Sequence, residues 1–253
     1  MNSTAKTDEL FRLSERYFRP GVITNFFLDR AAAETELEAG TLTVRPFDGG
    51  FAVLRERDGY RLLQFSIMPD AQLSEMPPHT VTEVPMRARG GDEKKVMQLL
   101  ADDGFALLFR RIRLTRLPGE ATGSTDPCIT TAAENDMPAA LALMEACFDR
   151  RTGCLPTADE LREERVYVYR QEGEIVGCLH EKDGRAASEL RHLCTASSVR
   201  GTGIASRLTD AYLSNCTKKS RVWVREDYAA ARHVYESRGY SPDGMISLVM
   251  AKD

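Results

Sequence analysis

A ten-residue segment without any hydrophobic pattern divides this chain of 253 residues into two halves. The segment, LPGEATGSTD at residues 117–126, is rich in Gly, Pro, Ser and Thr, as is typical of a linker. The halves differ in composition, because all six cysteines follow the segment: Cys128, Cys147, Cys154, Cys178, Cys194 and Cys216. We therefore predict an N-terminal α+β domain at 1–118, a linker at 119–126 and a second domain at 127–253.

The overall composition predicts an ordinary globular protein. Hydrophobic residues make up 42% of the chain and charged residues 28%, a balance that supports a sizeable core without disulfides. The formal net charge of −4 offers no basic excess to displace counterions, so nucleic acid is not expected as a partner. No cysteine stands in a C-x-x-C pair or at zinc-like spacing from a histidine, which predicts reduced cysteines and no bound metal.

The first residues do not have the pattern of a secretory signal, and no apolar run approaches the ~18 residues that a membrane helix needs. We expect a cytoplasmic protein without a membrane partner.

The second half alternates strands with helices, which predicts a mixed α/β sheet. Turn pairs such as Glu172-Gly173 and Asp183-Gly184 separate three successive strands. Strands are predicted at 128–132, within 165–196, at 221–224 and at 245–251, and helices are predicted after Asp136, at 157–164, from 204 and at 227–239.

The first half has a partly similar pattern. Helices are predicted at 7–18, 24–39 and 91–105, a three-strand meander at 42–68, and further strands at 80–86 and 106–117. Both halves contain a helix, a glycine, an aromatic residue and a strand in that order, around Gly104 and around Gly239. The first half is thus either a degenerate copy of the second or an unrelated scaffold.

A glycine-rich turn precedes one helix of the second half. The stretch SSVRGTGIASRL, residues 197–208, places Arg200, Gly201 and Gly203 before an apolar helical pattern. The first turn of a helix leaves N–H groups unpaired and carries a partial positive charge. Glycines there permit positive φ and close approach of an anion, so the turn predicts a phosphate cradle. A purely structural helix start is the alternative, and the P-loop and dinucleotide fingerprints are both absent.

Two segments of the second half resemble the GNAT superfamily of N-acetyltransferases, which use acetyl-CoA. The R/Q-x-x-G-x-G/A fingerprint corresponds to RGTGIA at residues 200–205, directly after the strand ELRHLCTA. The second signature corresponds to VWVREDYAAARHVYESRGY at 222–240. The resemblance covers roughly residues 127–253 and implies the GNAT α/β fold and acetyl-CoA as cosubstrate.

The resemblance implies a set of cofactor-binding residues. The pyrophosphate of CoA would bind at Arg200, Gly201, Thr202, Gly203, Ala205 and Ser206. The pantetheine arm would pair with the strand residues Leu193, Cys194 and Thr195, where one amide would also face the thioester oxygen. We expect Cys194 to be a small buried residue and not a nucleophile. Asp227 stands where the family often has an Asn that contacts pantetheine, and we expect it instead to cap the following helix.

The resemblance also implies catalytic residues. Tyr235, in the A-x-x-x-Y position, would protonate the departing thiolate, although an aromatic at this spacing also suits a core position. Glu189 is the candidate base for the ammonium proton and His192 is the other candidate. Their positions are three apart, so in a regular strand only one of them faces the cleft.

The resemblance implies direct transfer of an acetyl group to a primary amine. We expect the acceptor to be a small molecule or a peptide, and the protein to be a monomer or a homodimer. A CoA-binding sensor or assembly module without catalysis is the competing function. The first half has no phosphate loop, because the segment at 68–80 is short and rich in proline; we expect no CoA there.

Overall fold

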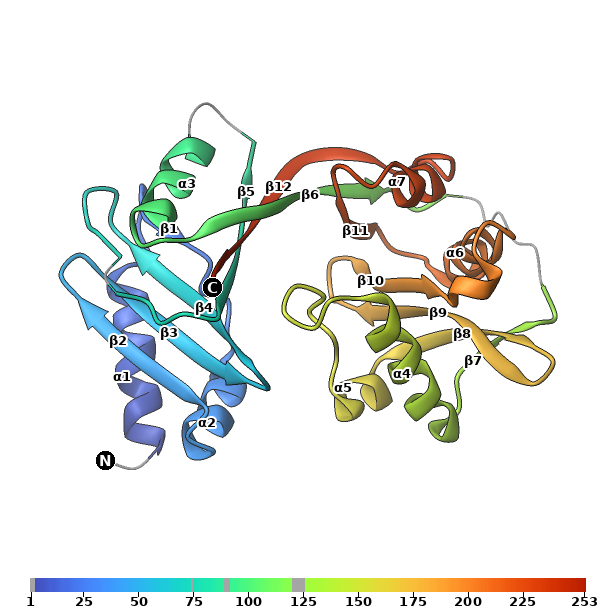
Figure 1. The fold of residues 1–253 in the computed structure, drawn as a ribbon, viewed down its shortest axis with the longest axis horizontal. Coiled ribbons are helices and arrows are strands. Elements are labelled where there is room, and N and C mark those ends of the chain that lie inside the picture. Colours follow the sequence, from blue (N-terminus) through green and yellow to red (C-terminus); the bar gives the residue numbers. More distant parts are fainter. Residues whose placement is uncertain (1–2, 74, 89–91, 120–125) are drawn as a thin grey trace. The chain divides into compact units, whose positions relative to one another are not determined.

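The computed structural model describes residues 3–73, 75–88, 92–119 and 126–253 and divides the chain into two compact units (Figure 1). The first unit contains Met1–Arg111 and Met245–Asp253, and the second contains Ile112–Gly244. This division differs from the predicted boundaries, since the last nine residues belong with the first half. Most of the predicted linker, 120–125, lies outside the described residues.

The first unit contains three helices and a sheet in its described residues. The helices are α1 (Ser3–Arg16), α2 (Arg30–Glu38) and α3 (Asp92–Asp102), and the strands are β1 (Ile23–Thr24), β2 (Leu42–Phe47), β3 (Gly50–Arg57), β4 (Tyr60–Ile67), β5 (Thr80–Arg87) and part of β6 (Ala106–Arg116). Strands β2, β3 and β4 form the predicted meander. The helix predicted at 24–39 begins late, because residues 23–24 pair with β4 and Asp29 caps α2 by accepting the Ala32 N–H at 2.9 Å.

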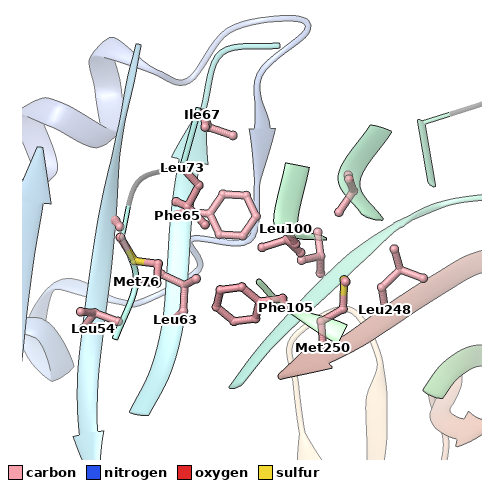
Figure 2. Close-up of a cluster of buried hydrophobic side chains, with 13 residues drawn as sticks. Leu54, Leu63, Phe65, Ile67, Leu73, Met76, Leu100, Phe105, Leu248 and Met250 are labelled. Carbon is pink, nitrogen blue, oxygen red and sulfur yellow. The ribbon is translucent and has the colours of Figure 1, made fainter. Parts of the chain in front are cut away.

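The C-terminal strand β12 (Ser241–Lys252) pairs with β5 of the first unit. Its residues 245–252 pair antiparallel with residues 80–87 of β5. Leu248 and Met250 are fully buried beside Leu63, Phe65 and Leu100 (Figure 2). The apolar run MISLVMA is therefore a strand as predicted, but it completes the core of the first unit.

The second unit contains an antiparallel meander followed by a parallel strand. Its strands are β7 (Ile129–Thr131), β8 (Arg165–Gln171), β9 (Glu174–Asp183), β10 (Ser188–Thr195) and β11 (Ser220–Arg225), in the spatial order β11-β10-β9-β8-β7. Its helices are α4 (Met137–Cys147), α5 (Ala158–Glu163), α6 (Ile204–Asn215) and α7 (Ala229–Glu236). These positions confirm the predicted order of elements.

Helices α4 and α6 cover opposite faces of this sheet. Leu208 and Tyr212 of α6 pack with Leu179 of β9, whereas Met144 of α4 packs with the neighbouring Cys178. Neighbouring strand residues point to opposite faces, so the two helices bury alternate positions of the same strands.

The two units share one order of elements. In each, three antiparallel strands precede a parallel strand and a helix: β2–β4, β5 and α3 in the first unit, β8–β10, β11 and α7 in the second. The first unit lacks a counterpart of α6, since the described residues between β4 and β5 form no helix. Within the described parts of the chain, no helix is long and apolar enough to cross a membrane.

Candidate active site at the splayed strands

Strands β10 and β11 separate after a short stretch of pairing. Their parallel register covers only Ser188–Ser220, Glu189–Arg221 and Leu190–Val222, although β10 continues to Thr195. The other edge of β10 stays paired with β9 throughout this region. Residues 191–195 therefore turn one backbone edge toward a gap between strands, the arrangement that lets an extended ligand add as a strand. The predicted pantetheine residues Leu193, Cys194 and Thr195 lie on this segment.

The glycine-rich turn lies directly after β10 and has the conformation that only glycine adopts readily. Gly201 and Gly203 have φ values of 79° and 83°. Gly203 is the N-cap of α6, and no side chain caps this helix. The Arg207 N–H donates to the Gly203 carbonyl at 3.0 Å, so the N–H groups of residues 204–206 precede the helical ladder. This end of α6 is suited to an anion.

Arg207 braces the turn, a role that the sequence motif did not indicate. Its guanidinium donates to the Thr202 carbonyl at 3.2 Å and pairs with Asp126 at 3.0 Å. It also lies over the Tyr169 ring, 5.1 Å from the centroid. The sequence feature that could have indicated this role is the position of Arg207 in the first turn of α6, close to the glycines. Arg200, by contrast, is exposed at the rim of the turn.

Tyr235 lies inside the second unit on α7 with 5% of its surface exposed. Its ring packs edge-to-face on Tyr240, with centroids 5.7 Å apart. Burial raises the pKa of the Tyr235 hydroxyl, and the neighbouring Tyr240 and Cys194 raise it further. The phenol is therefore held in its protonated form near a residue of the splayed strand.

Glu189 and His192 share one face of the sheet, so the expectation based on a regular strand is wrong. A β-bulge interrupts β10 between Leu190 and His192. Glu189 lies opposite Lys182 and His192 lies opposite His180. Lys182 and His180 are two residues apart on β9 and share a face, so their partners share it too. The bulge shifts the side-chain alternation by one position.

Both ring nitrogens of His192 are already engaged. Nδ1 lies 3.0 Å from Nδ1 of His180, and Nε2 lies 2.9 Å from the carbonyl oxygen of Gly153. His192 is 3% exposed. In this geometry it is unsuited to take a proton directly from an acceptor.

Cys194 belongs to a group of buried thiols. Its sulfur lies 3.3 Å from that of Cys178, directly across the β9–β10 pair. A hydrogen bond with the Cys147 thiol lowers the pKa of Cys194. The hydrogen bond with Cys178 and burial raise this pKa, and the result lies well above the ordinary value. A thiol held protonated in this way is a poor nucleophile, consistent with a packing role.

Asp227 does not cap α7, contrary to the expectation. The N-cap position is Tyr228, without a side-chain cap. The Asp227 carboxylate instead accepts two hydrogen bonds from Arg225, at 2.7 and 3.0 Å. The hydrogen bond with Arg225 lowers the pKa of Asp227. The ion pair with Arg225 therefore replaces the expected contact between the Asp227 carboxylate and the N-terminus of α7.

Comparison with known proteins identifies the second unit. A model of the acetyltransferase (GNAT) domain family matches residues 155–246, which contain the splayed strands, the glycine-rich turn and Tyr235. This part of the chain is a GNAT domain. Curated proteins yielded no match to the chain. The GNAT assignment supports acyl transfer in general terms.

Solved structures of proteins described as GNAT acetyltransferases are similar in fold to most of this chain. A GCN5-related N-acetyltransferase from Sphaerobacter thermophilus is 12% identical, with a TM-score of 0.57, over 98% of this chain and 93% of that one. An acetyltransferase from the GNAT family of Colwellia psychrerythraea is 17% identical, with a TM-score of 0.55, over 97% of each chain. A tandem GNAT protein from the clavulanic acid biosynthesis pathway is 12% identical, with a TM-score of 0.53, over 80% of this chain and 78% of that one. At these identities the likeness concerns the fold alone.

A pocket of about 410 Å³ lies in the first unit, apart from the GNAT domain. Val22, Val84, Met86, Asp92 and Lys95 are among its lining residues, and none of the predicted site residues lines it. In the described parts of the chain, no three His, Cys, Asp or Glu side chains are grouped to hold a metal ion.

Proposed function

We propose that the GNAT domain transfers an acetyl group from acetyl-CoA directly to a primary amine. The observation that carries this proposal is the separation of β10 from β11 immediately before a glycine-rich helix N-terminus. An extended thioester with a diphosphate at its far end needs both features in this order. The free strand edge offers backbone hydrogen bonds to the pantetheine arm, and the turn offers N–H groups to the diphosphate.

We assign the cofactor contacts to the residues that the motif names. Gly201, Gly203, Ala205 and Ser206 offer backbone N–H groups, Arg200 and Thr202 flank the anion, and Leu193, Cys194 and Thr195 pair with the arm. Asp227 is exposed and bound to Arg225, so its proposed contact with pantetheine requires that ion pair to yield.

The proposed reaction needs a base, an oxyanion donor and an acid. The amine loses a proton to Glu189 or to a water molecule, and its lone pair then attacks the thioester carbonyl carbon. A backbone N–H of the bulged segment at 191–195 stabilises the oxygen as negative charge develops there. The C–N bond forms, the C–S bond breaks, and Tyr235 gives its phenolic proton to the thiolate. The new C–N nitrogen then loses its second proton, which returns through solvent to the Tyr235 phenolate and leaves a neutral amide.

Thermal unfolding with and without acetyl-CoA tests the cradle. Saturation at ~100 times the dissociation constant is expected to stabilise the protein by about 2.7 kcal/mol. Gly201→Glu is expected to abolish the shift, because it places a carboxylate where the diphosphate would bind. Gly173→Glu is the matched control: both glycines have positive φ, and an added Cβ meets nothing within 4 Å at either. Equal loss in both variants would refute the cradle.

Release of free thiol from acetyl-CoA with a panel of primary amines tests the chemistry. The panel includes polyamines, aminoglycosides, amino acids and peptides. Turnover with any of them supports the acetyltransferase. Binding without turnover across the panel would favour a CoA-binding module without catalysis.

A further inference from the structure

A buried line of polar groups crosses the α4 face of the GNAT sheet. The Glu164 carboxylate lies 2.5 Å from Nε2 of His180, the two Nδ1 atoms of His180 and His192 lie 3.0 Å apart, and Nε2 of His192 lies 2.9 Å from the Gly153 oxygen. The two imidazole rings are nearly parallel, with an interplanar angle of 3° and centroids 5.3 Å apart, and they meet edge to edge through the two Nδ1 atoms. Both histidines are almost fully buried, at 1% and 3% exposure.

These three contacts need three protons if each is to be a hydrogen bond. The carbonyl of Gly153 and the carboxylate of Glu164 can only accept, so the protons must sit on the two rings. Two neutral imidazoles carry only two protons. The full line therefore contains one additional proton, which the pair of imidazole rings carries.

When the additional proton is lost, the hydrogen bond that breaks is the one between His192 and Gly153. Glu164 also binds Lys182, with 2.9 Å between the charged groups, and a hydrogen bond to a charged acceptor is stronger than one between neutral groups. His180 therefore keeps its proton toward Glu164 and accepts one from His192. The Nε2 atom of His192 then carries no proton. Its lone pair faces a lone pair of the Gly153 oxygen, and the two repel each other.

Gly153 lies in the loop at 148–156, which joins α4 to α5. Asp149 closes this loop by accepting hydrogen bonds from the amides of Arg151 and Thr152. Phe148 packs edge-to-face on the His192 ring, with centroids 5.2 Å apart. At the start of the loop, the Cys147 thiol lies 3.5 Å from the Thr195 carbonyl. The loop thus rests on the splayed segment of β10, beside the proposed acetyl-transfer site.

We propose that Glu164, His180 and His192 form a proton-dependent latch that docks the loop at 148–156 and positions it as a wall of the acceptor site. The three side chains are positioning residues and the Gly153 carbonyl is the group they hold. The part of this inference that concerns the acceptor rests on the proposed acetyltransferase function, whereas the latch itself does not.

Charged groups from three elements face the two rings. Glu160 and Glu164 come from α5 and its end, Lys182 from β9 and Arg191 from β10. Burial lowers the pKa of His180, and the Glu164 carboxylate offsets part of this effect. The additional proton is then released on the acid side of an ordinary histidine, below about pH 6.5.

The latch predicts that proton uptake and loop docking are coupled. The docked loop needs three protons and the undocked loop needs two, so lower pH favours docking. Hydrogen–deuterium exchange of the full chain, corrected for the intrinsic pH dependence, measures this directly at 148–156. We expect protection to fall roughly two- to tenfold as pH rises through the transition, as for the loss of one hydrogen bond.

Two variants separate the latch from simple packing. Glu164→Gln supplies an N–H donor to neutral His180, so all three bonds form without the additional proton. We expect its loop to stay protected at every pH. His192→Phe keeps an aromatic ring beside Phe148 but removes the donor to Gly153, and its loop should exchange faster at every pH.

Nitrogen-15 NMR of the histidine rings follows the proton itself. His79 and His233 are exposed and serve as internal controls. His180 should carry protons on both ring nitrogens at the pH where the loop is protected. Loop protection that is independent of pH in the wild type, or that titrates equally in Glu164→Gln, would overturn the latch. Exchange requires no acetyl-CoA, so failure of the proposed enzymatic function would leave this result interpretable.

Discussion

The last strand of the chain should stabilise the unit that is distant from it in sequence. Leu248 follows the GNAT domain, yet it is 0% exposed in the core of the first unit, beside Leu63 and Phe65. Leu248→Ala is therefore expected to destabilise β3 and β4, which precede it by about 180 residues or more.

The magnitude follows from burial. Returning the lost carbons to water costs roughly 2 kcal/mol, and the cavity in a close-packed core raises the total to about 3 kcal/mol. At about 1.4 kcal/mol for each factor of ten, exchange through unfolding of the first unit should accelerate roughly 100-fold.

Hydrogen–deuterium exchange resolved by peptide is the appropriate assay, because two units need not unfold together. Leu208→Ala is the matched control, since Leu208 is equally buried but lies on α6 in the second unit. Leu248→Ala should deprotect peptides of β3 and β4, and Leu208→Ala those of β8 and β9. If Leu248→Ala deprotects only β8 and β9, the assignment of the C-terminal strand to the first unit is wrong.

Three further substitutions test the GNAT domain. Tyr235→Phe keeps the buried ring and should lower kcat roughly 10²- to 10⁴-fold with little change in Tm. Because the pKa of Tyr235 is raised, its hydroxyl should stay protonated up to about pH 10, so an activity loss below that pH must come from another group; full turnover in the variant would exclude the acid role. Arg207→Ala should weaken acetyl-CoA binding by about tenfold, measured by calorimetry, because the turn loses its brace to Thr202; unchanged affinity would show that the turn holds its shape alone. Tyr212→Phe should lower the free energy of unfolding by about 1–2 kcal/mol in a urea titration, since its hydroxyl lies 2.9 Å from the Ser188 hydroxyl and 2.7 Å from that of Ser220; a neutral effect would mean that the two serines re-pair.

The sequence by itself determined the elements of the second half and the place of the candidate cradle. Hydrophobic spacing identified α6, α7 and the strands around them, because these elements each bury one face or one run of side chains. Glycine at 201 and 203 signalled positive φ, since few other residues adopt it without strain. Both the hydrophobic spacing and the glycine positions depend only on residues that are close together in the sequence, so they can be recognised without the tertiary structure.

Tertiary structure alone decided which residues meet. A strand pattern does not specify its partner, so the pairing of residues 245–252 with β5 had no local signal. The bulge in β10 inserts one residue and reverses the alternation, which brought Glu189 onto the face of His192. The Asp227 carboxylate pairs with Arg225 and does not cap α7. Helix α2 begins later than predicted, because residues 23–24 pair with β4. Glu164, His180 and Gly153 come together only because separate segments fold onto one sheet face, and no spacing along the chain encodes that contact.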